Sequence, residues 1–271
     1  MPSRRLTSLD AINQNYRHIY LQPHYDDAIL SCGGAIAQQI RFGQQALVIT
    51  VFGGVPGASA ALSPFAAQNH RQTGLSGSVA EAVAARRDED EKAVGALGAD
   101  VLALDYPDAI YRGSPAYYQA EESLFGSVNP NDVPYDEELG ALFLNIAERA
   151  PLAAIYAPLG IGHHVDHQLC CSAADRLAQR KLNVKFYEDF PYVTRPGALE
   201  DRQRELGMPM EPEMVEISGQ LREKEEALAL YKSQVRQLFG SEDAMRQALR
   251  TYSGSIRRTY PGIYIERYWR W

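Results

Sequence analysis

Four of the six histidines fall in two short polar clusters that could do chemistry. The first cluster is His24-Tyr25-Asp26-Asp27, and the second is HHVDH at residues 163–167, far along the chain. Imidazoles and carboxylates in one cleft are the ligands of a catalytic zinc site, which keeps one position for water. Two histidines and one carboxylate also suit the facial triad of non-haem Fe(II) enzymes, so the ligand types leave the metal open. If the two clusters meet, they predict a metal-dependent enzyme.

The neighbouring Asp26 and Asp27 allow two different roles. One carboxylate could bind a metal while the other acts as a general base toward a water molecule. Because both stand at the start of a predicted helix, the helix dipole would favour their ionised forms. Helix capping alone would also explain the two aspartates, and a solvated helix start would explain HHVDH. The presence of both clusters favours the chemical interpretation.

Alternating strand and helix patterns place the two clusters at one edge of a sheet. Strands are expected over residues 18–24, 46–52, 101–106, 153–158 and 184–189, with a short one over 214–217 and an edge strand over 262–269. Helices are expected over residues 27–41, 81–97, 136–149, 164–180 and 221–239. This alternation predicts a Rossmann-like, three-layer α/β fold, with a mostly parallel central sheet and helices on both faces. The clusters follow the first and fourth strands, and such sheets bind ligands at the carboxyl ends of their strands.

The whole chain, residues 1–271, is expected to form a single domain, because no linker-like stretch interrupts these patterns. Residues 53–80 and 108–134 lack a clear periodicity and are expected to be functional loops. Gly33-Gly34 lies inside the first predicted helix, where close packing against the sheet explains it better than a phosphate loop.

Composition argues against several classes of function. The net charge of −7 makes a nucleic-acid partner unexpected and disfavours attraction to an anionic membrane. No apolar run is long enough to span a membrane, and the N-terminal residues show no apolar signal-peptide region. The three cysteines, Cys32, Cys170 and Cys171, are odd in number and do not suggest a disulfide framework. A cytoplasmic location is therefore expected.

The segment PHYDDAILSCGG resembles the PHPDDA/E…GG signature of the PIG-L/LmbE de-N-acetylases, and residues 164–167 contain their HxDH motif. The order of the motifs and the intervening RRDEDEKAVGALGA at residues 86–99 agree with that family. The resemblance is strongest over residues 17–190, whereas residues 200–271 are expected to add a C-terminal helix and the edge strand. Tyr25 replaces the usual proline of the first motif, which should leave that turn less constrained.

The resemblance implies a zinc-dependent hydrolase that removes the N-acetyl group from an N-acetylglucosamine-like sugar conjugate. Three positions match the metal ligands of the family: His24, Asp27 and His167. By the same resemblance, Asp26 is the general base, His164 stabilises the oxyanion and Asp166 orients His164. Zinc lowers the pKa of a bound water from ~15.7 to about 7, although Fe²⁺ or another divalent metal would also suit the ligands.

Four further side chains are expected to face the substrate: Arg86, Asp108, Arg112 and His163. A solvated helix face would also explain Arg86, and ordinary turn chemistry would explain Asp108 and Arg112. His163 stands four residues before His167, so the spacing alone would allow either His163 or His164 to act.

Other functions remain open. The chain could be an amidase that cleaves another amide of a sugar conjugate, or a noncatalytic sugar-binding protein of the same fold. A nucleotide-binding Rossmann module is disfavoured, because the first strand is followed by HYDD and not by GxGxxG. The expected partner is a small N-acetylated amino-sugar substrate, and the sequence leaves a homo-oligomer open.

Overall fold

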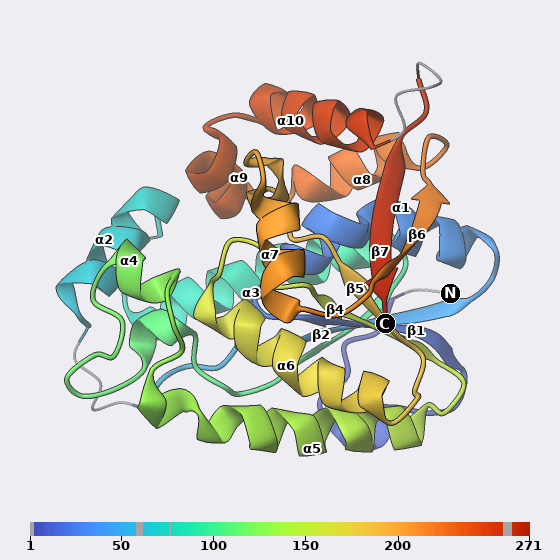
Figure 1. Ribbon diagram of the computed structural model, residues 1–271. Helices are drawn as coiled ribbons and strands as arrows, with labels where there is room; N and C mark the ends of the chain where they lie inside the picture. Colours follow the sequence, from blue (N-terminus) through green and yellow to red (C-terminus); the bar gives the residue numbers. More distant parts are fainter. Residues whose placement is uncertain (1–2, 58–61, 76, 257–261) are drawn as a thin grey trace.

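The computed structural model describes residues 3–57, 62–75, 77–256 and 262–271. Its centre is a seven-stranded sheet with the order β3-β2-β1-β4-β5-β7-β6, shown in Figure 1. The strands are β1 (Tyr16–Gln22), β2 (Gln45–Thr50), β3 (Asp100–Ala103), β4 (Ala154–Pro158), β5 (Val184–Tyr187), β6 (Glu211–Glu216) and β7 (Ile265–Arg270). β1 to β5 pair in parallel, and β7 pairs antiparallel with both β5 and β6. The predicted α/β fold with a mostly parallel sheet is confirmed.

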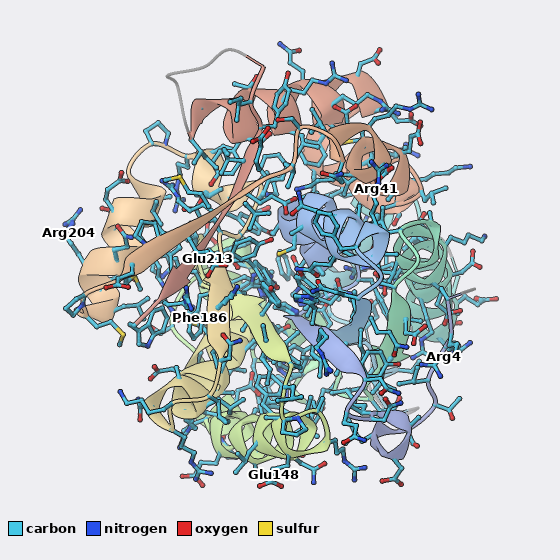
Figure 2. All side chains as sticks on the ribbon, turned by 90° about the vertical axis from the view of Figure 1, so that its right-hand side faces the viewer. Arg4, Arg41, Glu148, Phe186, Arg204 and Glu213 are labelled. Atoms are coloured by element: carbon cyan, nitrogen blue, oxygen red, sulfur yellow. The ribbon has the colours of Figure 1, made fainter. Side chains whose placement is uncertain are left out.

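Helices cover both faces of this sheet (Figure 1). One face carries α5 (Pro134–Arg149) and α6 (Val165–Gln179), and the other carries α1 (Asp27–Arg41), α3 (Val79–Ala96) and α8 (Leu221–Leu228). The remaining helices are α2 (Pro64–Thr73), α4 (Glu121–Leu124), α7 (Ala198–Leu206), α9 (Lys232–Phe239) and α10 (Glu242–Ser255). Figure 2 shows Phe186 of β5 between the layers, whereas Glu148 on α5 and Arg204 on α7 lie at the surface. None of the described helices is both long and apolar enough to cross a membrane.

The middle strands are apolar because both of their faces are covered. In β1, Ile19, Tyr20 and Leu21 have no exposed surface, as expected for a strand buried on both sides. β1 lies between β2 and β4, so the order of the strands reverses at this point. In such a sheet the loops that follow the two strands open a crevice at their carboxyl ends. These are the loops that carry the two histidine clusters.

Several helices differ from the sequence-based prediction. The helix expected over residues 221–239 is in fact two, α8 and α9. The break comes at Tyr231, whose backbone is not helical (φ −83°, ψ 64°) and whose buried hydroxyl donates to Asp90 at 2.6 Å. The expected loop at 53–80 contains α2, and the one at 108–134 contains α4 and two 3-10 turns. No helix was predicted at α7 or α10.

The prediction of an edge strand over residues 262–269 is wrong. The strand that forms, β7, lies between β5 and β6, and β6 is the edge. β7 carries the buried Glu266, which pairs with Lys224 at 2.7 Å and accepts hydrogen bonds from two backbone N–H groups of α1 at 2.8 Å. Strand β6 is suited to the edge because most of its side chains are exposed. A Cβ on Gly34 would lie 2.7 Å from Ile217, so this glycine allows close packing, although against the segment after β6.

Candidate active site

The loops after β1 and β4 meet, as the topology predicted. The ring centroid of His24 lies 4.7 Å from that of His164 and 5.5 Å from that of His167. One nitrogen of each of these three buried imidazoles lies within 4.8 Å of the others. His24 lies in the loop between β1 and α1, while His164 is the N-cap of α6 and His167 lies in the first turn of that helix. Two segments far apart in the sequence therefore form one polar centre.

Asp27 stands between two of the imidazoles. Its Oδ2 lies 3.5 Å from His24 Nδ1 and 3.4 Å from His167 Nε2, and it accepts the backbone N–H of His24 at 2.8 Å. Burial alone would raise the pKa of Asp27, but the charge and hydrogen bond of His167 hold it well below the usual range. Asp27 therefore stays ionised in the interior, facing both rings.

The outer nitrogen of each ring contacts a second carboxylate. His167 Nδ1 lies 2.6 Å from Asp189 Oδ1, and His24 Nε2 lies 2.9 Å from Asp166 Oδ2. A carboxylate in this position accepts the ring N–H, which fixes the tautomer and directs the other nitrogen's lone pair away from it. When the proton facing Asp27 is lost, as metal binding requires, His24 Nδ1 and His167 Nε2 both present a lone pair on the side of Asp27. Two oriented imidazoles and one ionised carboxylate are a donor set that fits a divalent metal ion.

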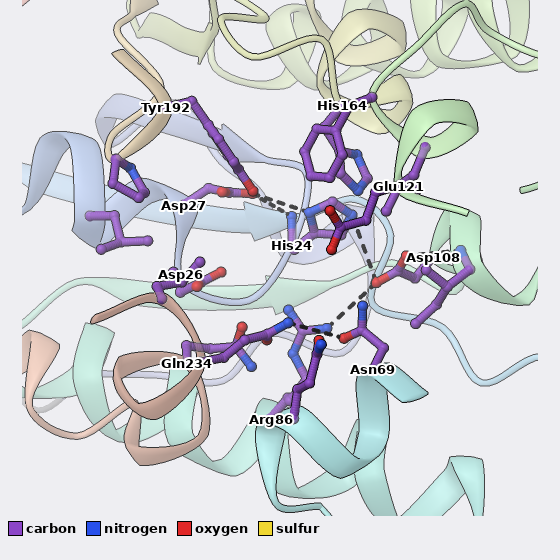
Figure 3. Close-up of a pocket in the computed structure, with 18 of the residues that line it drawn as sticks. His24, Asp26, Asp27, Asn69, Arg86, Asp108, Glu121, His164, Tyr192 and Gln234 are labelled. Atoms are coloured by element: carbon purple, nitrogen blue, oxygen red, sulfur yellow. Dashed lines mark hydrogen bonds and ion pairs between the residues drawn. The ribbon is translucent and has the colours of Figure 1, made fainter. Parts of the chain in front are cut away.

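Asp26 differs from its neighbour in backbone and environment. Its φ of 127° is rare for a residue with a side chain, and the side chain lines the cavity without contacting the imidazoles (Figure 3). Burial, together with the adjacent Asp27 carboxylate, raises the pKa of Asp26 well above its usual value. Asp26 can therefore hold a proton under conditions where an ordinary aspartate is ionised.

His164 faces the cavity as a neutral imidazole. Burial and the nearby His24 hold the pKa of His164 well below its usual value. Its Nδ1 accepts the backbone N–H of Asp166 at 3.2 Å, so Nε2 carries the proton. We expected Asp166 to orient this ring through its carboxylate. The contact with His164 comes from the Asp166 backbone instead, because the carboxylate bonds to His24 and Arg112.

A cavity of about 640 Å³ opens in front of these residues. Figure 3 shows His24, Asp27 and His164 on one side and Arg86 and Gln234 opposite. The predicted Arg86 and Asp108 do line it, with Arg86 Nη1 3.5 Å from Asp108 Oδ2. Further lining side chains come from four other segments: Phe65, Asn69, Gln72, Glu121, Phe125, Tyr192, Gln234, Arg236 and Gln237.

Two of the four side chains expected to face the substrate do not line this cavity. Arg112 is only 3% exposed and forms ion pairs with Asp166 and Asp132 behind the histidines. His163 turns away from the cavity, and its Nε2 lies 3.3 Å from Glu205. The φ of His163 is 65°, so the backbone reverses direction just before His164. The spacing of His163 and His167 could not reveal this turn.

Comparison with known proteins assigns the chain to a family. Residues 19–178 match the model of the PIG-L family, described as GlcNAc-PI de-N-acetylase. A 2'-N-acetylparomamine deacetylase from Niallia circulans is 33% identical over 244 residues, which cover 85% of this chain and 86% of that protein. This chain belongs to the PIG-L de-N-acetylase family.

Other similarities extend over most of this PIG-L family chain. A 2'-N-acetylparomamine deacetylase from Streptomyces fradiae is 29% identical over 254 residues, covering 91% of this chain and 81% of that protein. The crystal structure of the zinc-inhibited form of a teicoplanin deacetylase superposes with a TM-score of 0.77 at 26% identity, covering 93% of this chain and 97% of that one. These matches confirm the resemblance drawn from the two motifs, and the fold.

The sequence did not indicate most of the cavity that this PIG-L family member presents. Asn69 and Gln72 come from α2, and Gln234 and Gln237 come from α9. Residues 53–80, which contain α2, were expected to be a functional loop, but no residue of α2 or α9 was predicted to line a site, since amides are common on exposed helices. Asp189, at the end of the fifth predicted strand, was not among the predicted site residues. Its position at the carboxyl end of a parallel strand, which it shares with the two histidine clusters, could have marked it as a candidate site residue.

Proposed function

We propose that this protein is a metal-dependent hydrolase that removes the N-acetyl group from an amino-sugar conjugate. The proposal rests on the pair of imidazoles of His24 and His167. One nitrogen of each ring contacts a carboxylate, and the other nitrogen faces Asp27. The proteins named above as deacetylases of 2'-N-acetylparomamine and of teicoplanin support the same reaction on a sugar conjugate.

His24, Asp27 and His167 would hold the metal ion, which we propose to be zinc. A divalent ion supplies a water of lowered pKa and polarises the amide carbonyl. Asp26 is the proposed general base, placed in the cavity beside Asp27. A raised pKa suits this role, because a general base works best when its pKa lies near the working pH.

In the proposed reaction, Asp26 transfers the proton and His164 stabilises the developing charge. Asp26 accepts a proton from the attacking water while the water oxygen forms a bond to the carbonyl carbon of the acetyl group. The Nε2–H of His164 donates to the oxyanion that develops on the carbonyl oxygen, a contribution of about 3–4 kcal/mol in comparable sites. Asp26 then gives its proton to the amide nitrogen as the C–N bond breaks. The products are the free amine and acetic acid, which ionises to acetate.

The cavity has the size and the polar groups for a sugar conjugate. Its volume of about 640 Å³ lies in the range of small-molecule sites. Arg86 and Asp108 offer a donor and an acceptor side by side, as vicinal sugar hydroxyls require. The aromatic rings of Phe125 and Tyr192 form an apolar wall, with ring centroids 5.7 Å apart.

The test is acetate release from 2'-N-acetylparomamine and from a panel of N-acetylglucosaminyl conjugates, with free amine measured in parallel. The metal-free protein should be inactive, and activity should return with about one equivalent of a divalent metal. Zinc should be titrated beyond one equivalent, because a similar deacetylase has a zinc-inhibited form. Release of another acid from the same panel would favour the alternative amidase, and binding without release would favour a sugar-binding protein.

The cytoplasmic location and the homo-oligomer considered above stay predictions.

A further inference from the structure

Arg112 lies in the middle of a buried chain of charges that reaches the metal site. Its Nη1 lies 2.6 Å from Asp166 Oδ1, and its Nε lies 2.9 Å from Asp132 Oδ2. All three side chains are at least 98% buried. The other oxygen of Asp166 contacts His24 Nε2 at 2.9 Å and accepts the backbone N–H of Ala109 at 3.0 Å. The charges therefore run from Asp132 through Arg112 and Asp166 to His24.

Three aromatic rings surround the guanidinium group of Arg112. Its central carbon lies 5.0 Å from the ring centroid of Phe52, 5.4 Å from that of Tyr135 and 5.6 Å from that of Tyr118. A cation held against aromatic rings is stabilised when it is shielded from water. The Nη1 group also donates to the carbonyl of Pro107 at 3.3 Å. Arg112 is thus held by contacts that a substrate does not supply.

We propose that Arg112 is a positioning residue for the metal site and acts on His24 through Asp166. This inference rests on the proposed metal-dependent function. Asp166 has no exposed side-chain surface, and a buried carboxylate that loses its cationic partner is strongly destabilised. Without Arg112, Asp166 would be free to rotate or to leave its place. His24 would then lose the contact that directs its Nδ1 toward Asp27.

The geometry explains why this position requires arginine. Nε and Nη1 lie within ion-pair distance of two different carboxylates, and a planar guanidinium group can approach both while it lies against aromatic rings. Lysine would keep the charge but could satisfy one carboxylate at most. Arg112→Lys therefore keeps the positive charge but removes the simultaneous contact with Asp166 and Asp132, so it distinguishes the effect of the charge from that of the contacts.

The alternative is a purely structural role, in which Arg112 only fastens the segment before α5 to α6. That role predicts lower stability and an unchanged site. The two roles are distinguished by the affinity of the metal-free protein for Zn²⁺, measured by competition with a chromophoric chelator. This measurement needs no substrate and no catalytic turnover.

Arg112→Lys should weaken zinc binding by about 10–100-fold, the usual effect of losing a group that orients a metal ligand. Raising the zinc concentration should restore binding to one equivalent. Arg250→Lys is the matched control, because Arg250 also forks onto a buried carboxylate, that of Glu225 at 2.6 and 2.8 Å, and neither residue lines the cavity. Its zinc affinity should equal that of the wild type. Equal affinities in wild type and Arg112→Lys, with a lower melting temperature in the variant, would overturn the inference.

Asp132→Asn provides a second variant if Arg112→Lys does not fold. This variant weakens the ion pair between Arg112 and residue 132 and leaves the pair of Arg112 with Asp166 in place. Its zinc affinity should therefore fall, but by less than that of Arg112→Lys. An unchanged affinity in a folded Asp132→Asn protein would also count against the proposal. If the wild type binds no divalent metal, the proposed function itself fails, and the inference fails with it.

Discussion

Replacing Asp90 with asparagine should flatten the pH dependence of the stability of this protein. Asp90 lies on α3 and is 2% exposed. Its carboxylate accepts hydrogen bonds from Tyr231 at 2.6 Å and Gln22 at 3.1 Å. Burial raises the pKa of Asp90 to about 6, since these hydrogen bonds offset only part of the cost of burying the charge.

The sign of the effect follows from comparing the folded and unfolded chains. An unfolded aspartate has a pKa of about 3.9, so the folded state binds this proton more tightly. The stability contributed by neutral Asp90 is fully present below pH 3.9 and is lost as the pH rises through about 6. A shift of roughly two pKa units amounts to about 3 kcal/mol in all, of which about 1 kcal/mol should be lost between pH 5 and pH 8.

The assay is urea unfolding of the metal-free wild type and of Asp90→Asn from pH 5 to pH 8. The difference between their free energies of unfolding should change by about 1 kcal/mol over this range, with the wild type losing more as the pH rises. Asp88→Asn is the control, because Asp88 lies exposed on the same helix beside Lys92. Its curve should run parallel to that of the wild type. If the Asp90→Asn curve is parallel as well, Asp90 does not titrate in this range and the reasoning is wrong.

Three further predictions concern the catalytic cavity. Asp26→Asn should lower kcat by about 10²–10⁴-fold with the metal content unchanged, while Asp88→Asn should have no effect. His164→Gln should lower kcat by about 10²–10³-fold with little change in KM, because its donor acts on charge that develops in the transition state. A chelator should abolish acetate release and lower the melting temperature, and added divalent metal should reverse both. Retained activity in Asp26→Asn or after chelation, or a loss confined to KM in His164→Gln, would contradict the corresponding role.

The parallel core of the fold could be predicted from the sequence, whereas its C-terminal part could not. Strands such as β2 are continuous apolar runs between helices, which is the pattern of a strand covered on both faces. β7 instead alternates and reads as an edge strand, although it is paired on both sides. In this inner position it buries Glu266, whose partners Lys224 and α1 lie far away in the sequence. Contacts between residues so far apart in the sequence leave no periodic signal.

The meeting of the two histidine clusters was predictable for the same reason as the core. The carboxyl ends of β1 and β4 must be neighbours once the strands are parallel and adjacent, so the histidine clusters had to meet. The substrate side was not predictable, because it depends on where loops and helix ends turn. Arg112 follows a 3-10 turn that directs it under the site, and Tyr231 breaks a helix so that α9 reaches the cavity. Neither turn contains a residue type from which it could have been predicted.

The sequence also could not say how two adjacent aspartates come to behave differently. Two carboxylates this close repel each other, so the environment must push their pKa values apart. The backbone decides the direction. Asp27 begins α1 and faces two imidazoles, whereas the φ of 127° at Asp26 turns its side chain into the cavity, where burial and Asp27 raise its pKa. Strain at one residue thus yields an ionised carboxylate that can hold a metal ion and a neighbour that can exchange a proton, the two groups that the proposed amide hydrolysis requires.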